Sequence, residues 1–169
     1  MTQTQKDRDA LREWAVFYES GLRRQNSDVN LTQAQIAKDR TRLEADPIEW
    51  IRFFFPEYCK FEFAEFQIKA IRRCIKHEEW FEVLSWARGL AKSTTVMFIV
   101  IYLALTKKKC NVMMASATQD SAVRLLDPYK KQLEENALIR AYYGVQVNLG
   151  NWCAEEFVAK CGCSFRAVG

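Results

Sequence analysis

The pattern of apolar and polar positions predicts helices early in the chain and an alternation of strands and helices afterwards. Before residue 80, helices are predicted at 9–24, 33–44, 47–55 and 64–77. The second of these is strongly polar and opens with Thr32 and Gln35 at the spacing of a capping box. The third has Asp46 as its N-cap, Pro47 in its first turn and Pro56 just beyond its end.

After residue 80, short apolar runs alternate with helical segments. The predicted strands are 82–86, 111–115, 155–159 and 164–168, and the predicted helices are 92–106, 121–135 and 137–143. This order predicts a three-layer α/β sheet, whose ligands bind beyond the carboxyl ends of its strands. We expect the polar turn Ser116–Asp120 and the loop before residue 92 to lie together at that edge.

The loop after the first predicted strand has the sequence Ala87-Arg88-Gly89-Leu90-Ala91-Lys92-Ser93-Thr94. It is close to the phosphate-binding pattern G-x-x-x-x-G-K-[ST], and the strand, loop and helix come in the order that such a site requires. In this interpretation Lys92 reaches the β- and γ-phosphates, the Ser93 hydroxyl binds Mg²⁺, and Thr94 donates to the α-phosphate. The motif predicts a protein that binds ATP or GTP.

Two alanines make the motif irregular. Ala87 and Ala91 stand where the pattern has glycine, and only Gly89 keeps full backbone freedom. A left-handed conformation at Ala91 costs about 1–2 kcal/mol, so the loop avoids that cost only if φ is negative there. The alternative is an ordinary strand, turn and helix. A lysine at a helix start is unfavourable for the helix dipole, however, and Lys92 therefore favours a bound anion.

Composition narrows the class of protein. The chain has 169 residues, of which 49% are apolar, enough for a packed core in one domain or in part of a larger protein. No apolar run reaches the roughly 18 residues of a membrane span, and the polar N-terminus does not resemble a signal peptide. The net charge of +4 permits a polyanionic partner. The basic clusters lie where helix surfaces and ends favour cations, so none is assigned to DNA: Arg72-Arg73, Lys107-Lys108-Lys109 and Lys130-Lys131.

The chain contains six cysteines, which we expect to be reduced because no secretion signal is present. Cys153, Cys161 and Cys163 weakly suggest a zinc site. Their spacing is not C-x-x-C and the single histidine, His77, is far away in the sequence. The sequence therefore favours the alternative, in which these cysteines are small apolar residues that pack around a strand.

Four features in order resemble the large terminase subunits of tailed phages, the ATP-driven motors that package DNA into proheads. They are the segment 63–67, the irregular loop at 86–94, the Ser/Thr-rich turn at 116–122 and the strand ending at 165–169. The resemblance covers residues 46–169. It implies a P-loop NTPase (RecA/ASCE-like) three-layer α/β/α core in residues 59–169, preceded by a helical N-terminal region in residues 1–58.

The resemblance also implies roles for individual residues, with ATP and Mg²⁺ as cofactors. Gln67 would read the adenine edge while Phe66 packs nearby, and Arg88, together with Lys92, would act in catalysis by meeting the γ-phosphate charge. Nucleotide contacts would come from the whole loop, from Ala87 through Arg88, Gly89, Leu90, Ala91, Lys92 and Ser93 to Thr94. The alternatives are an exposed helical Gln67 and an ordinary surface Arg88.

The partners implied by the resemblance are double-stranded DNA, a portal protein, a small terminase subunit and further copies in a ring, in the host cytoplasm. The sequence departs from the family at its end, because no apolar strand closing in two acidic residues precedes Gly169. Neither Glu134-Glu135 nor Glu155-Glu156 fits that role. We therefore expect an N-terminal portion, truncated before the Walker B strand and inactive alone. A superfamily-2 helicase-like DNA-dependent ATPase fragment and a non-hydrolysing P-loop scaffold remain the alternatives.

Overall fold

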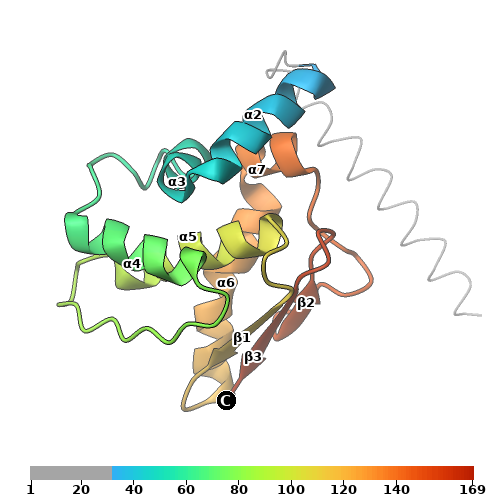
Figure 1. Ribbon diagram of the computed structural model, residues 1–169. Helices are drawn as coiled ribbons and strands as arrows, with labels where there is room; N and C mark the ends of the chain where they lie inside the picture. The colour runs from blue at the N-terminus through green and yellow to red at the C-terminus, as the bar shows by residue number, and fades with distance from the viewer. Residues whose placement is uncertain (1–31) are drawn as a thin grey trace, which may run out of the picture.

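The computed structural model describes residues 32–169, and the helix predicted at 9–24 lies outside them (Figure 1). The described elements, in chain order, are α2 (Gln33–Ala45), α3 (Pro47–Phe54), α4 (Glu65–Lys76), α5 (Lys92–Leu105), β1 (Asn111–Ala115), α6 (Gln119–Glu135), α7 (Ala137–Tyr143), β2 (Glu156–Val158) and β3 (Ser164–Val168). The protein is therefore mixed α/β, as predicted. No helix in this range is both long and apolar enough to cross a membrane.

Local sequence explains where most of the helices begin. Thr32 and Gln35 form the predicted capping box at the start of α2. The Asp46 carboxylate accepts a hydrogen bond of 2.9 Å from the Ile48 N–H at the start of α3. Helix α6 begins two residues earlier than predicted because Thr118 is its N-cap and accepts from the Ser121 N–H. The predicted turn at 116–120 is correspondingly shorter.

The sheet has three strands in the order β1-β3-β2. β1 and β3 are parallel, with Asn111 opposite Ser164 and Ala115 opposite Val168, whereas β2 is antiparallel to β3. The chain between the parallel strands crosses over through α6 and α7, and α6 packs on both β1 and β3. On the opposite face of the sheet Met113 is 66% exposed. This sheet is too small to show a RecA-like core.

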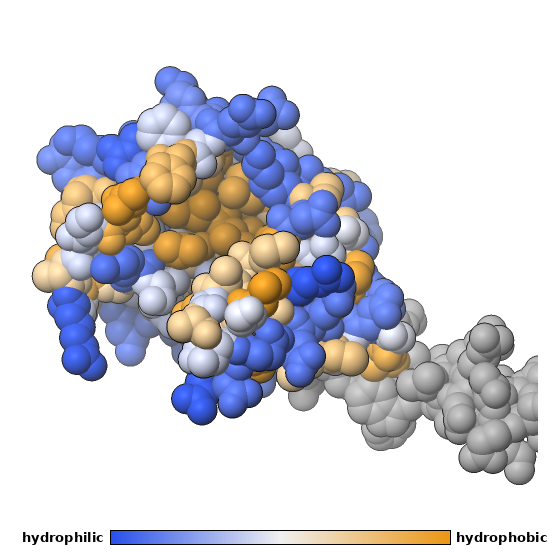
Figure 2. Space-filling view, turned by 90° about the horizontal axis from the view of Figure 1, so that it is seen from below, coloured by the Kyte–Doolittle hydropathy of each residue, from blue (hydrophilic) through white to orange (hydrophobic). Residues whose placement is uncertain are grey.

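The strand predicted at 82–86 does not form. Its side chains alternate between exposed and half-buried, which is the period-two pattern that suggested a strand. A strand also needs a neighbour to share hydrogen bonds, and no described strand pairs with this segment. Phe81 and Val83 consequently remain 87% and 68% exposed. Figure 2 shows hydrophobic side chains gathered in a hollow on the lower face of the molecule.

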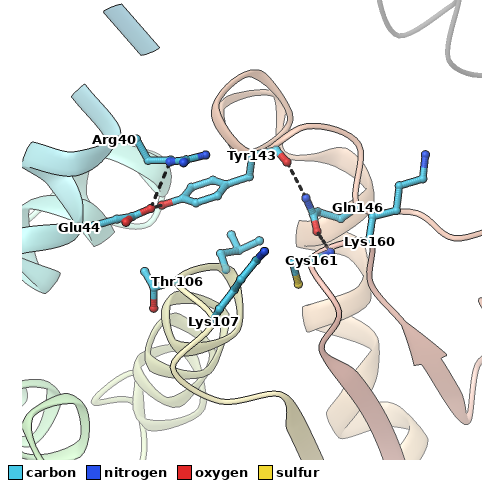
Figure 3. A pocket seen from close by; sticks show the side chains of 9 residues that line it. Arg40, Glu44, Thr106, Lys107, Tyr143, Gln146, Lys160 and Cys161 are labelled. Atoms are coloured by element: carbon cyan, nitrogen blue, oxygen red, sulfur yellow. Dashed lines mark hydrogen bonds and ion pairs between the residues drawn. The ribbon is translucent and has the colours of Figure 1, made fainter. Parts of the chain in front are cut away.

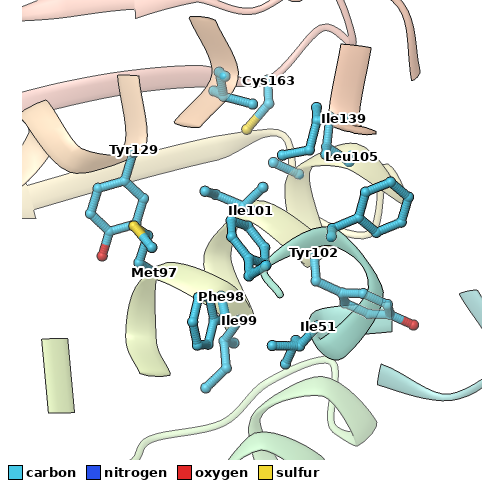
Figure 4. Close-up of a cluster of buried hydrophobic side chains, with 14 of the residues drawn as sticks. Ile51, Met97, Phe98, Ile99, Ile101, Tyr102, Leu105, Tyr129, Ile139 and Cys163 are labelled. Atoms are coloured by element: carbon cyan, nitrogen blue, oxygen red, sulfur yellow. The ribbon is translucent and has the colours of Figure 1, made fainter. Parts of the chain in front are cut away.

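The core surrounds α5, which is apolar on nearly every side (Figure 4). Buried side chains from α5 pack against α3 on one side and against the sheet and α6 on the other, in one continuous cluster. Trp50 of α3 is fully buried, and its indole N–H donates to the Tyr143 hydroxyl at 2.8 Å. The same hydroxyl donates to Glu44 at 2.9 Å. This cluster includes residues from both sides of position 58, where the sequence analysis divided the helical region from the ATPase region. That division stays a prediction.

Candidate nucleotide site

The loop before α5 bends through two residues with positive φ. Gly89 has a φ of 87° and Ala91 a φ of 54°, while Leu90 between them is not among the residues with positive φ. Alternating backbone conformations of this kind turn successive N–H groups toward one side and form concave anion-binding sites. A Cβ at Gly89 would meet no atom within 4 Å, so its backbone conformation alone favours glycine there.

Ala91 adopts the left-handed conformation that a side chain normally avoids, with φ 54° and ψ 32°. The negative φ that would have spared the loop this cost is therefore not present. The left-handed region costs about 1–2 kcal/mol for a residue with a Cβ. Ala91 N-caps α5 without any side-chain hydrogen bond, and the first-turn N–H groups have no intrahelical acceptor. Those N–H groups are available to an anion.

The polar side chains of the motif are not committed to other contacts. The side chains of Arg88, Lys92 and Ser93 make no hydrogen bond or ion pair within residues 32–169. Arg88 and Ser93 are exposed and Lys92 is half-buried. The buried Thr95 behaves differently, because both its hydroxyl and its N–H donate to the Ala91 carbonyl at 2.9 Å. Thr95 thus joins the loop to the helix, a role that the sequence analysis missed although the residue directly follows the motif.

The start of α4 lies against this loop. The Gln67 side-chain amide donates to the Leu90 carbonyl at 3.2 Å and accepts from the Ala64 N–H at 2.9 Å. The ring of Phe66 meets the ring of Trp86 edge-on, with 4.9 Å between their centroids. The structure therefore brings together the two segments that the sequence linked to adenine and to phosphate. The Gln67 amide keeps a second N–H and a second lone pair for another ligand.

Glu82 holds the segment ahead of the loop, and sequence reasoning did not identify it. Its carboxylate accepts hydrogen bonds from Arg73 of α4, at 3.2 Å from Nε, and from the Trp80 indole at 2.6 Å. The hydrogen bond from Arg73, followed by that from Trp80, lowers the pKa of Glu82. This pairing ties the chain to α4 in place of the strand hydrogen bonds that are absent.

The turn after β1 is fixed to the end of β3. The Gln119 side chain donates to the Ala167 carbonyl at 3.2 Å and accepts from the Gly169 N–H at 3.0 Å. The turn therefore lies at the carboxyl edge of β1 and β3, as predicted. The loop at 87–91 does not follow a strand of this sheet, because the segment before it is unpaired.

One member of each acidic pair that the sequence set aside makes a structural contact. Glu156 pairs with Arg166 at 2.7 Å, and Glu134 accepts a hydrogen bond from the Trp152 indole. Residues 32–169 contain no group of three or more potential His, Cys, Asp or Glu metal ligands. Cys163 is buried in the core, where burial raises the pKa of its thiol to about 12.

Comparisons of this chain with protein-family models, with curated proteins and with solved structures gave no match.

Proposed function

We propose that the loop at 87–94 binds the phosphates of ATP, with Mg²⁺ held by Ser93. The supporting observation is the junction of α4 and the loop, where Gln67 donates to the Leu90 carbonyl. The uncapped helix start supplies N–H donors and a positive dipole end. Lys92 and Arg88 supply charge without an internal partner in the described part of the chain. Adenine would then lie beside Phe66 and Gln67.

The larger function that we propose is that of a DNA-packaging ATPase of the large terminase type. Its support is the resemblance of the four segments, together with the proximity of two of them in the structure. A RecA-like core requires more parallel strands beside β1 than residues 32–169 supply. Hydrolysis, the pull on double-stranded DNA, and assembly with a portal protein, a small subunit and further copies belong to this proposal.

The test of nucleotide binding is a calorimetric titration with Mg·ATP on three proteins: the original chain, Lys92→Ala and Lys38→Ala. Lys38 is an exposed helical lysine far along the sequence from the loop and serves as the matched control. Loss of the Lys92 charge should weaken binding by at least about 10-fold, since hydrogen bonds to charged groups contribute about 1.5–3 kcal/mol. Lys38→Ala should bind as the original chain does. Equal affinities for all three proteins would refute the site.

A second titration tests which nucleotide base the site prefers. ATP should bind more tightly than GTP, and Gln67→Ala should reduce that preference because it removes the amide that would read the adenine edge. A preference unchanged by Gln67→Ala would place the base elsewhere.

The helicase-like alternative predicts the same nucleotide binding and differs in the process that ATP hydrolysis drives. The scaffold alternative differs already in nucleotide binding, because it predicts none. At a hundred-fold excess over its Kd a ligand stabilises the fold by about 2.7 kcal/mol, or roughly 5–10 °C in Tm. Absence of any shift with Mg·ATP would favour the scaffold.

A further inference from the structure

A cavity lies at the end of α5 opposite the loop at 87–94, between α2, the end of α5 and the turn that joins β2 to β3 (Figure 3). Its volume is about 390 Å³. On this measure one water needs roughly 10–15 Å³, so the cavity can hold a small solute with several waters. Its lining includes the cations Arg40, Lys107 and Lys160 against the single carboxylate of Glu44.

The negative charge of the one carboxylate in the lining is already paired with a cation. Glu44 lies 3.5 Å from the Arg40 guanidinium and accepts a hydrogen bond of 2.9 Å from the Tyr143 hydroxyl. Arg40 also lies over the Tyr143 ring, 5.5 Å from its centroid. These contacts hold the guanidinium at the cavity while leaving its other N–H groups available.

Lys107 is placed at the cavity by the way that α5 ends. The Lys107 N–H donates to the Ala104 carbonyl at 3.1 Å, and the Lys108 N–H donates to the Leu103 carbonyl at 2.9 Å. This is the Schellman arrangement, in which the residue after the C-cap is left-handed and is usually glycine. Lys107 occupies that position with a φ of 58°. A lysine therefore stands where the backbone favours glycine.

The three consecutive lysines at 107–109 differ in the contacts that their side chains make. Lys108 donates to the Tyr102 hydroxyl, and Lys109 donates to the Glu78 carbonyl. The Lys107 side chain makes no hydrogen bond or ion pair with any residue that the structure describes. Figure 3 shows its amino group pointing into the space between Tyr143 and Cys161.

We propose that this cavity binds a small oxyanion, a phosphate or carboxylate group, through Lys107 and Arg40. The site is separate from the nucleotide loop and does not depend on it. Residues with sparsely populated backbone conformations cluster at ligand sites, and Lys107 is such a residue with its amino group at the cavity. A second explanation for a lysine here is the favourable interaction of a cation with the carboxyl end of a helix. Anion binding and this helix-end interaction predict different results for variants of Lys107.

The experiment is calorimetry with inorganic phosphate and, separately, with succinate, in a Lys92→Ala background so that anion binding at the nucleotide loop is weakened. One of the two anions should bind, which also identifies the group that the site prefers. Lys107→Gly should weaken that binding by about 10-fold or more. The same variant should raise the Tm of the ligand-free protein by about 1–4 °C, because relief of the left-handed strain outweighs the added conformational entropy of the unfolded chain. Loss of binding in a more stable protein cannot come from misfolding.

Two further variants complete the test. Lys107→Arg keeps the charge and should retain binding within a few-fold, and Lys109→Gln should bind like its parent because Lys109 does not line the cavity. Failure of both anions to bind, or undiminished binding by Lys107→Gly, would overturn the proposal. A lower Tm for Lys107→Gly with unchanged binding would leave only the helix-end explanation.

Discussion

Replacement of Ala91 by glycine should stabilise the protein, although it removes a side-chain atom. Ala91 has a φ of 54°, and the left-handed region costs a residue with a Cβ about 1–2 kcal/mol. Glycine removes that cost but increases the conformational entropy of the unfolded chain, which opposes folding by about 0.4–1 kcal/mol. Because Ala91 is exposed, loss of its methyl group sacrifices little buried area. The net expectation for Ala91→Gly is a gain of about 0.5–1 kcal/mol, or roughly 1–4 °C in Tm.

Ala87→Gly is the matched control, because it is the same substitution in the same loop at a residue without positive φ. Only the entropy of the unfolded chain changes there, so this variant should lose about 0.4–1 kcal/mol. Urea denaturation followed by far-UV circular dichroism measures both free energies of unfolding. A loss of stability in Ala91→Gly equal to that in Ala87→Gly would show that Ala91 is not strained, and the reasoning would fail.

Three further variants test other parts of the structure. Tyr143→Phe removes a hydroxyl that accepts from the Trp50 indole and donates to Glu44, so it should lower the free energy of unfolding by about 1–3 kcal/mol in denaturant titration, whereas an unchanged value would contradict the buried network. Gln67→Ala should lower it by about 0.5–1.5 kcal/mol and increase hydrogen exchange at the start of α4, because the Ala64 N–H loses its acceptor. Glu82 has a lowered pKa in the folded protein, so its contribution is present above the unfolded pKa of about 4.3 and is lost as the pH falls through the folded value. Glu82→Gln should therefore flatten the dependence of stability on pH as the pH falls below about 4.3, and parallel curves for the two proteins would contradict the pairing with Arg73.

The contact of Gln67 with the loop connects the proposed nucleotide site to the fold. Gln67 belongs to α4 and Leu90 to the loop, and the hydrogen bond between them joins segments that are 23 residues apart. Only about half of the polar capacity of the amide is used by these backbone contacts. An adenine at this position would thus bind to groups that α4 already holds in place, which lowers the entropy cost of ordering them.

The sequence by itself determined the helices, because their causes are local. A helix bonds residues four apart, so its caps and periodicity lie within one stretch of chain. Thr32 and Gln35 at α2, and Asp46 with Pro47 at α3, act as predicted. The strands 111–115 and 164–168 were also predicted with their correct bounds. The P-loop-like motif could be noticed in the sequence because its residues are consecutive, and its role in nucleotide binding stays a prediction.

Tertiary structure decided everything that depends on a distant partner. The segment 82–86 has the alternation of a strand, but pairing requires a neighbour, and none of the described strands provides it. The order β1-β3-β2 depends on which strands meet after the crossover, which no local pattern encodes. The left-handed conformation of Ala91 follows from how the loop enters α5, so residue type alone did not predict it. The contact of Gln67 with Leu90 exists only because α4 folds against the loop.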